Sequence, residues 1–324
     1  MNRRDFLAVV GAAPWLIPEA YGEPQEKLPR IGFLGRLPPN LSAGEELRQG
    51  LREFGYVEGK DILIEWRQTL GYEDELRPLA AELVRMNVDV IVTFGTPAAR
   101  AALEATKTIP VVFTAVGDAV ATGLTTSLAK PSANGTGISQ LGAETATKRF
   151  DYLHQLSPRI RRVAYLGNPA NPATRTGLES IRVAAQSVGI KLNTYNAINS
   201  GEIESALRTI PWKSVDGVLI AGDPVFLAEG AKIAQAVRAA KVPAIFPWRE
   251  FHEYGVLMSY SSDWRDALRR GAYFVAKILK GAKPSDLPVE QVSRIELIID
   301  LRVARELRIE VPKELLYRAD KVIR

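Results

Sequence analysis

The sequence has no cysteine and only two histidines, His154 and His252, among its 324 residues. A chain without cysteine forms no disulfide, has no thiol nucleophile and offers no thiolate ligand to a metal. The two histidines belong to no pattern with metal-ligand spacing, which speaks against a zinc or iron site. We therefore predict a protein that holds no metal and no resident cofactor.

Sequence motifs of nucleotide chemistry and of hydrolysis are missing as well. No Gly-x-Gly-x-x-Gly follows the first apolar run, and neither a Walker loop nor a Gly-x-Ser-x-Gly elbow occurs. No nucleophile stands beside a base. We predict no catalytic residues, and an exported enzyme that works through the carboxylates of Asp118 and Asp223 stays as an alternative.

Charge of one sign does not accumulate anywhere in the chain. The 42 lysine and arginine residues outnumber the 37 aspartate and glutamate residues, for a net charge of +5, and they are scattered. They are not interleaved with aromatic residues in a patch. We therefore predict no nucleic-acid partner.

Long hydrophobic runs are rare, and the one at the N-terminus has the form of an export signal. Arg3 and Arg4 precede an apolar stretch over 6–17, and small residues follow at a cleavage site after Gly22. The stretch is shorter than the ~20 residues of a membrane span. Its Arg-Arg-x-Phe-Leu sequence is typical of a twin-arginine signal. Residues 1–22 thus predict export to the periplasm, with membrane association as the alternative if the segment is retained.

The sequence does contain a regular alternation of strand and helix patterns, which predicts parallel sheets covered by helices on both faces. In the first half, strands are expected over 30–35, 61–67, 88–94 and 109–116, and helices over 43–54, 73–86 and 97–105. In the second half, helices are expected over 143–156, 176–188, 203–210 and 225–239, and strands over 162–167, 191–197, 217–221 and 242–247. The tail adds strands over 255–260 and 294–299 and helices over 264–279, 301–307 and 313–319.

A stretch rich in Gly, Ser and Thr, from Gly117 to Gly142, separates the two halves. We place a crossing between two lobes within 132–141, since a chain of this length forms about two domains. The extended connection after residue 279 predicts a chain that crosses back. The expected division is 28–138 with about 262–285 for lobe 1, and 139–261 with about 286–324 for lobe 2.

Several expected strands end in a glycine followed by a polar residue, often with proline next. These corners are Gly95-Thr96-Pro97, Gly117-Asp118, Gly167-Asn168-Pro169 and Gly222-Asp223-Pro224. Carboxyl ends of parallel strands are where ligands bind, and helix N-termini attract anions. Thr96 with the Ala98 and Ala99 amides is a candidate clamp for a carboxylate, and Asp118 and Asp223 are candidate acceptors for an ammonium or hydroxyl group. The alternative is that these residues only cap helices.

Aromatic residues near expected strand ends, Phe246, Trp248 and Tyr260, either pack in the core or form a cleft wall. Together, the corners and these rings give a set of candidate ligand-binding residues. The set is Gly95, Thr96, Pro97, Ala98, Gly117, Asp118, Gly167, Asn168, Gly222, Asp223, Phe246, Tyr260 and Asp263.

Longer segments resemble a known family. They include LREFGYVEGKDILIEWR, ELVRMNVDVIVTFGTPAARAA, TIPVVFTAVGD, LGNPANP, LMSYSSD and the stretch from ILKGAKPSDLPVEQ to the C-terminus. With them the chain resembles the tryptophan-binding-like extracytoplasmic solute-binding proteins of ABC transporters. The resemblance implies a two-lobed, type I-like α/β periplasmic-binding fold with a ligand cleft between lobes, each a parallel sheet flanked by helices. It also implies a membrane permease as partner.

By position, this resemblance puts the corners at Thr96, Asp118, Asn168 and Asp223 in the cleft, and 260–263 near the hinge. The chain departs from the family where Ala119 follows Gly117-Asp118 and Ser261 follows Ser259-Tyr260. We expect a monomeric receptor for a small, carboxylate-bearing solute such as an amino acid. A ligand sensor that acts on a membrane receptor is a further alternative.

Overall fold

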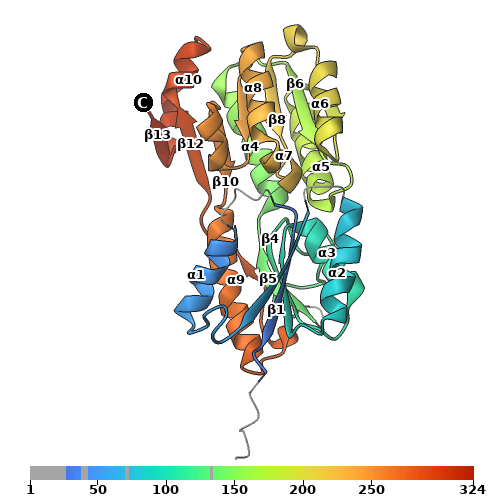
Figure 1. Ribbon diagram of the computed structural model, residues 1–324. Helices are drawn as coiled ribbons and strands as arrows, with labels where there is room; N and C mark the ends of the chain where they lie inside the picture. The colour runs from blue at the N-terminus through green and yellow to red at the C-terminus, as the bar shows by residue number, and fades with distance from the viewer. Residues whose placement is uncertain (1–26, 38–42, 70–72, 132–133) are drawn as a thin grey trace, which may run out of the picture.

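The computed structural model describes residues 27–37, 43–69, 73–131 and 134–324. The chain forms two lobes, each built on one sheet (Figure 1). The expected export signal, 1–22, lies outside the described residues. Among the helices of the described ranges, none has the length and apolar character needed to cross a membrane.

The sheet of lobe 1 is parallel, and helices cover both of its faces. Its strand order is β11 (Glu290–Gln291), β5 (Gly135–Ser139), β4 (Val111–Val116), β3 (Val90–Phe94), β1 (Arg30–Gly35) and β2 (Leu63–Gln68). One face carries α1 (Ala43–Glu53) and α9 (Trp264–Leu279), and the other carries α2 (Leu76–Arg85), after the short η1 (Glu73–Glu75), and α3 (Thr96–Ala105).

The apolar runs of these strands arise because both faces of the sheet are buried. In β1, Ile31 and Phe33 face one core, whereas Leu34 belongs to a second core beneath α2 and α3. In β3, Val92 and Ile91 divide in the same way. This two-sided burial is why the sequence shows continuous hydrophobic runs instead of a strict alternation.

Lobe 2 has a mixed sheet. Its order is β13 (Lys321–Ile323), β12 (Glu296–Asp300), β10 (Met258–Ser261), β9 (Ala244–Phe246), β8 (Gly217–Ile220), β6 (Arg162–Gly167) and β7 (Lys191–Asn196). All neighbours are parallel except β10 and β12, so the expected parallel sheet contains one antiparallel pair near this edge.

Helices cover both faces of the lobe 2 sheet as well. One face carries α4 (Gly142–Leu156) and α5 (Pro172–Ser187), and the other carries α6 (Ser200–Thr209), α7 (Pro224–Ala228) and α8 (Gly230–Ala240). Shorter elements complete the chain: η2 (Trp212–Ser214), η3 (Arg249–Tyr254), η4 (Pro284–Asp286), α10 (Leu301–Glu306) and α11 (Lys313–Arg318).

Several sequence expectations are wrong in detail. The helix expected over 225–239 is two helices, because Glu229 leaves helical geometry at φ −98° and ψ 18°. Gly230 then approaches the ring of Phe251, which a side chain at that position would contact at 3.0 Å. Strands β5, β11 and β13 were not expected.

The chain changes lobes three times, after β5, after β10 and after β11. Because β11 pairs with β5, the sheet of lobe 1 includes Glu290 and Gln291. The last crossing therefore lies beyond Gln291, later than the expected boundary near 285. All three crossings use strands at one side of the sheets, which leaves β2 and β7 at the opposite side.

Gly137 makes β5 hard to recognise in the sequence, and its backbone conformation leaves no room for a side chain. Its φ is +142°, and a side-chain Cβ at this position would lie 2.0 Å from the carbonyl oxygen of Phe113 in β4. We expect Gly137→Ala to lower the free energy of unfolding by at least about 2 kcal/mol, as measured by urea denaturation. The control is Gly201→Ala, in α6 with no close backbone contact, which should be neutral or slightly stabilising. Equal effects of the two substitutions would contradict this account.

Candidate functional site

The carboxyl ends of the strands in the two lobes face each other across a narrow cavity of about 50 Å³. Lobe 1 contributes Gly95, Thr96 and Gly117, and lobe 2 contributes Arg149 and Trp248 among others. A solute larger than one or two water molecules enters only when the lobes part, since one water occupies about 30 Å³. The cavity therefore belongs to a closed arrangement of the lobes.

A larger cavity of about 510 Å³ lies elsewhere, on lobe 2 alone. Its walls include Val242 and Val256, which precede β9 and β10, so it lies at the amino ends of these strands. Ligands of open parallel sheets bind at the carboxyl ends. We therefore assign the candidate site to the smaller interlobe cavity, which both lobes build.

The lobes approach each other through residues with little or no side chain. A Cβ built on Gly117 of lobe 1 would lie 2.5 Å from the Cβ of Ala173 in α5 of lobe 2. A Cβ on Gly95 would lie 3.2 Å from Cγ of Pro224 in lobe 2. Glycine at these two positions is what allows the backbones to come this close.

Thr96 lies in the interlobe cavity, but its hydroxyl is used within lobe 1. It accepts a hydrogen bond of 2.9 Å from the backbone N–H of Gly117, and Gly95, with φ +84°, takes the cap position of α3. Gly222 also lines the cavity. Pro97 and Ala98 are buried and do not line it, so only part of the expected clamp reaches the cavity.

Asp223 is a helix cap whose two oxygens are both occupied. One oxygen accepts from the backbone N–H of Val225 at 2.9 Å, and the other accepts from the side-chain amides of Asn168 at 2.9 Å and Asn171 at 2.8 Å. Burial raises the pKa of this carboxyl. The geometry favours the capping interpretation of Asp223 over contact with a ligand.

Asn168 and Asp118 likewise serve local structure. Asn168 and Gly167 line a separate cavity of about 210 Å³ on lobe 2. Asp118 accepts from the backbone N–H groups of Val120 and Ala121, both at 2.9 Å, and does not line the interlobe cavity.

The remaining expected residues lie behind the cavity or at the hinge. Phe246 is fully buried in the core against Phe251, with ring centroids 4.7 Å apart. The ring of Tyr260 packs edge-on against Tyr152. Asp263 caps α9 through the backbone N–H of Arg265.

Arg149 is the chief residue that sequence reasoning missed. It projects from α4 into the interlobe cavity, is 6% exposed, and donates from Nη1 to the carbonyl of Tyr260 at 3.0 Å. No carboxylate in the described part of the chain forms an ion pair with it, and burial lowers its pKa to about 10. The sequence did hold a signal: an arginine between Ala146 and Leu153 on the buried face of a helix.

Two further donors in the cavity lack acceptors. Trp248 Nε1 and Gln140 Nε2 are buried and have no hydrogen-bond partner among the described residues. Tyr165, which also lines the cavity, donates its hydroxyl to the carbonyl of Thr174, and burial raises its pKa. The cavity thus holds a surplus of donors and one positive charge.

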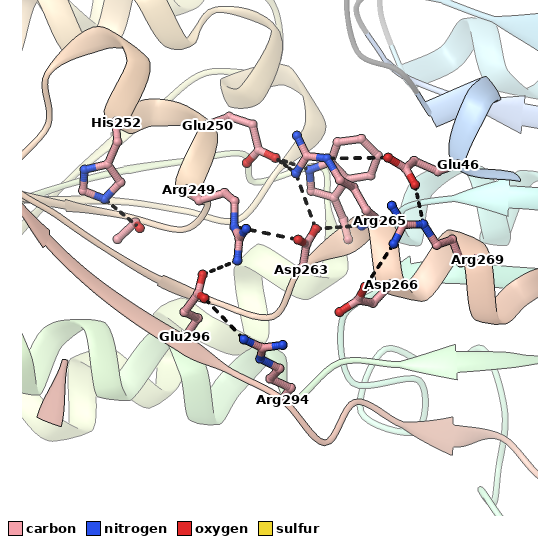
Figure 2. A network of polar contacts seen from close by, with 12 residues as sticks. Glu46, Arg249, Glu250, His252, Asp263, Arg265, Asp266, Arg269, Arg294 and Glu296 are labelled. Atoms are coloured by element: carbon pink, nitrogen blue, oxygen red, sulfur yellow. Dashed lines mark hydrogen bonds and ion pairs between the residues drawn. The ribbon is translucent and has the colours of Figure 1, made fainter. Parts of the chain in front are cut away.

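Ion pairs join the lobes at the hinge (Figure 2). Arg265, at the start of α9 in lobe 1, contacts Glu250 of η3 in lobe 2 and lies 3.8 Å from Glu46 of α1. Arg249 of lobe 2 lies 3.7 Å from Asp263 at a crossing and also pairs with Glu296. These charges flank two of the three crossings.

Residues 39–323 match the family model described as ABC transporter substrate binding protein. The chain belongs to this family. Substrate-binding proteins of this family bind small-molecule solutes outside the cytoplasm and interact with ABC permeases. The two-lobed, type I-like fold expected from the resemblance is confirmed.

Three relatives illustrate the match. The tyrosine-binding protein of Clostridioides difficile (strain R20291) is 24% identical over 252 residues, which are 78% of this chain and 72% of that protein. A conserved domain protein from Vibrio cholerae O1 biovar El Tor has 29% identity and a TM-score of 0.85, covering 91% of this chain and 100% of its own. A domain from Streptococcus pneumonia in complex with L-Trp has 26% identity and a TM-score of 0.83, covering 92% and 100%.

His252 in this substrate-binding protein makes stability depend on pH. It contacts Ser259 Oγ at 2.9 Å, and burial lowers its pKa to about 4. The folded chain therefore keeps His252 neutral while the unfolded chain protonates it below pH 6.5, so stability is lost as pH falls from 6.5 to about 4. We expect the free energy of unfolding to fall by about 3 kcal/mol more in the wild type than in His252→Gln over this range, measured by urea denaturation. If the free energy of unfolding falls equally with pH in the wild type and in His252→Gln, this prediction is wrong.

Proposed function

We propose that this protein binds a small carboxylate-bearing solute, an amino acid or a related compound, between its lobes. It delivers the solute to the membrane permease of an ABC importer. The observation that carries the proposal is the guanidinium of Arg149, buried in the interlobe cavity without a carboxylate partner among the described residues. The expected export over residues 1–22 supports a periplasmic site of action.

The energetics favour an anion at this place. A buried charge without a partner is costly, and an approaching carboxylate offsets this cost through charge-assisted hydrogen bonds. The indole Nε1 of Trp248 and the amide Nε2 of Gln140 add donors for acceptor atoms of the same solute. An ammonium compound without an acid group would bring a second positive charge next to Arg149 with no carboxylate to balance it.

Aromatic walls and the relatives support an amino acid as the class of solute. Tyr165 and Trp248 line the cavity, and their rings offer flat surfaces for an apolar or aromatic side chain. The Clostridioides relative is named for tyrosine, and the Streptococcus domain was solved with L-Trp.

The proposed delivery of the solute to the permease depends on the movement of the two lobes about the hinge. The solute binds best when both lobes surround it, so it shifts the population from open to closed. A monomer in the closed form presents the permease with surfaces of both lobes at a fixed separation. The solute is released unchanged, since the described residues that line the cavity pair no nucleophile with a base.

Arg149→Gln tests the proposal directly. Glutamine keeps a donor for the carbonyl of Tyr260 but removes the charge. We expect the affinity for the acid to fall at least 100-fold, because the carboxylate loses its buried counter-charge. We also expect the solute-free protein to melt at an equal or higher temperature, because an unpaired buried charge is removed. Calorimetry with L-tyrosine, L-tryptophan and any acid that co-purifies, alongside thermal unfolding, measures both effects.

The matched chemical control is the carboxamide of each acid. Wild type should prefer the acid over the amide, and Arg149→Gln should lose this preference. Mass spectrometry of solutes released from the purified protein should detect a carboxylic acid. A co-purified solute without an acid group, an unchanged acid preference in the variant, or chemical conversion of the solute would each overturn the proposal.

A further inference from the structure

The side of the cleft opposite the hinge carries a contact between the lobes that differs from the hinge pairs. Arg36 follows β1 of lobe 1, is 3% exposed, and donates from Nη2 to the backbone carbonyl of Ile198 at 2.8 Å. Ile198 follows β7, so the bond joins lobe 1 to lobe 2.

The strand order places this contact far from the hinge. In lobe 2, strands β9, β8 and β6 lie between β10, where the chain crosses, and β7, which precedes Ile198. In lobe 1, β4 and β3 lie between the crossing strand β5 and β1, which precedes Arg36. A hinge rotation displaces atoms in proportion to their distance from the axis. A bond this far from the crossings breaks early when the lobes part.

Arg36 also lies within electrostatic reach of Asp223, a buried carboxyl group of lobe 2. The positive charge of Arg36 acts on Asp223 and opposes the rise that burial causes in the pKa of that carboxyl. Asp223 already binds Asn168, Asn171 and Val225, so it holds its position without help from lobe 1. Lobe 2 thus presents a fixed backbone carbonyl and a fixed, buried carboxyl group on the side of the cleft where the guanidinium lies.

We propose that Arg36 is a latch that closes the mouth of the interlobe cleft, the side opposite the hinge, by binding the Ile198 carbonyl. Arg36 does not line the interlobe cavity, so it acts on the population of the closed form and not on the chemistry of the solute. Arg149, in contrast, selects the solute. The role in solute uptake rests on the proposed function, whereas the role in closure does not.

The chain offers a direct way to measure closure without a solute. It has no cysteine, so Gly117→Cys with Ala173→Cys introduces a single possible disulfide across the lobes. The built Cβ on Gly117 lies 2.5 Å from Cβ of Ala173, and a disulfide needs about 3.5–4.5 Å, so a local shift of about 1–2 Å in the loop at 117 lets the bond form while the lobes are closed. The rate of disulfide formation under a fixed glutathione buffer then reports the closed population.

In this double-cysteine protein, Arg36→Gln should slow disulfide formation about tenfold or more, the effect expected for loss of a charge-assisted hydrogen bond. Arg36→Lys keeps the charge and should slow it less. The matched control is Arg208→Gln, which breaks an exposed ion pair with Glu204 on α6 and should leave the rate unchanged. Circular dichroism verifies that each variant is folded.

An unchanged rate in Arg36→Gln overturns the latch. If that variant does not fold, an unchanged rate in Arg36→Lys overturns it instead. Because no solute is present, these outcomes are independent of what the protein binds. With a solute that binds wild type, Arg36→Gln should lower affinity yet keep the preference for acid over amide, whereas a lost preference would assign Arg36 to the ligand and contradict the latch.

Discussion

A positive charge enclosed between two lobes is the constraint on which the rest of the site depends. Arg149 reaches the interlobe cavity from α4, and among the described residues only the carbonyl of Tyr260 accepts a hydrogen bond from it. Closing the lobes removes water from this charge, which makes the closed form costly alone and strengthens the attraction for an anion. The closed lobes and the acidic solute that we propose therefore favour each other, and this mutual dependence suits the proposed role in delivery.

Much of the fold could be predicted because its local rules agree with its tertiary structure. Strands buried on both faces are visible as apolar runs, and the helix over 264–279 was predicted with the bounds that it has. The failures occur where partners decide the structure. The strand at Gly135–Ser139 has two glycines and little β-propensity, and it forms because β4 and β11 pair with it. The antiparallel direction of Glu296–Asp300 depends on the hinge crossing, for which the sequence has no local signal.

The corners were predicted to gather around one cavity, and only some of them line it. Parallel strands bring their carboxyl ends together by geometry, so the corners at Gly95, Thr96, Gly117 and Gly222 do line the cavity. In the sequence, a polar side chain at such a corner is equally compatible with capping a helix and with contacting a ligand. Only contacts with residues distant in the chain distinguish the two roles. Asn171, for example, donates a hydrogen bond to the carboxyl oxygen of the cap residue Asp223. Arg149, the anchor that we propose, was not predicted because it lies in the middle of a helix and not at a strand end.

Different interactions hold the lobes together on the two sides of the cleft, with ion pairs at the hinge and a buried hydrogen bond at the mouth. At the hinge, Arg265 and Arg249 each have two or more carboxylates within reach and remain partly exposed, so partners exchange at little cost as the lobes rotate. At the mouth, Arg36 makes a directional bond in a buried setting, and such a bond is either formed or lost. Closely fitted contacts such as Gly117 with Ala173 add a steep repulsion against further closure. With exchangeable ion pairs on one side and the proposed latch on the other, we expect two defined arrangements of the lobes instead of a continuum. Two such arrangements are what a permease needs in order to distinguish a closed form from an open one.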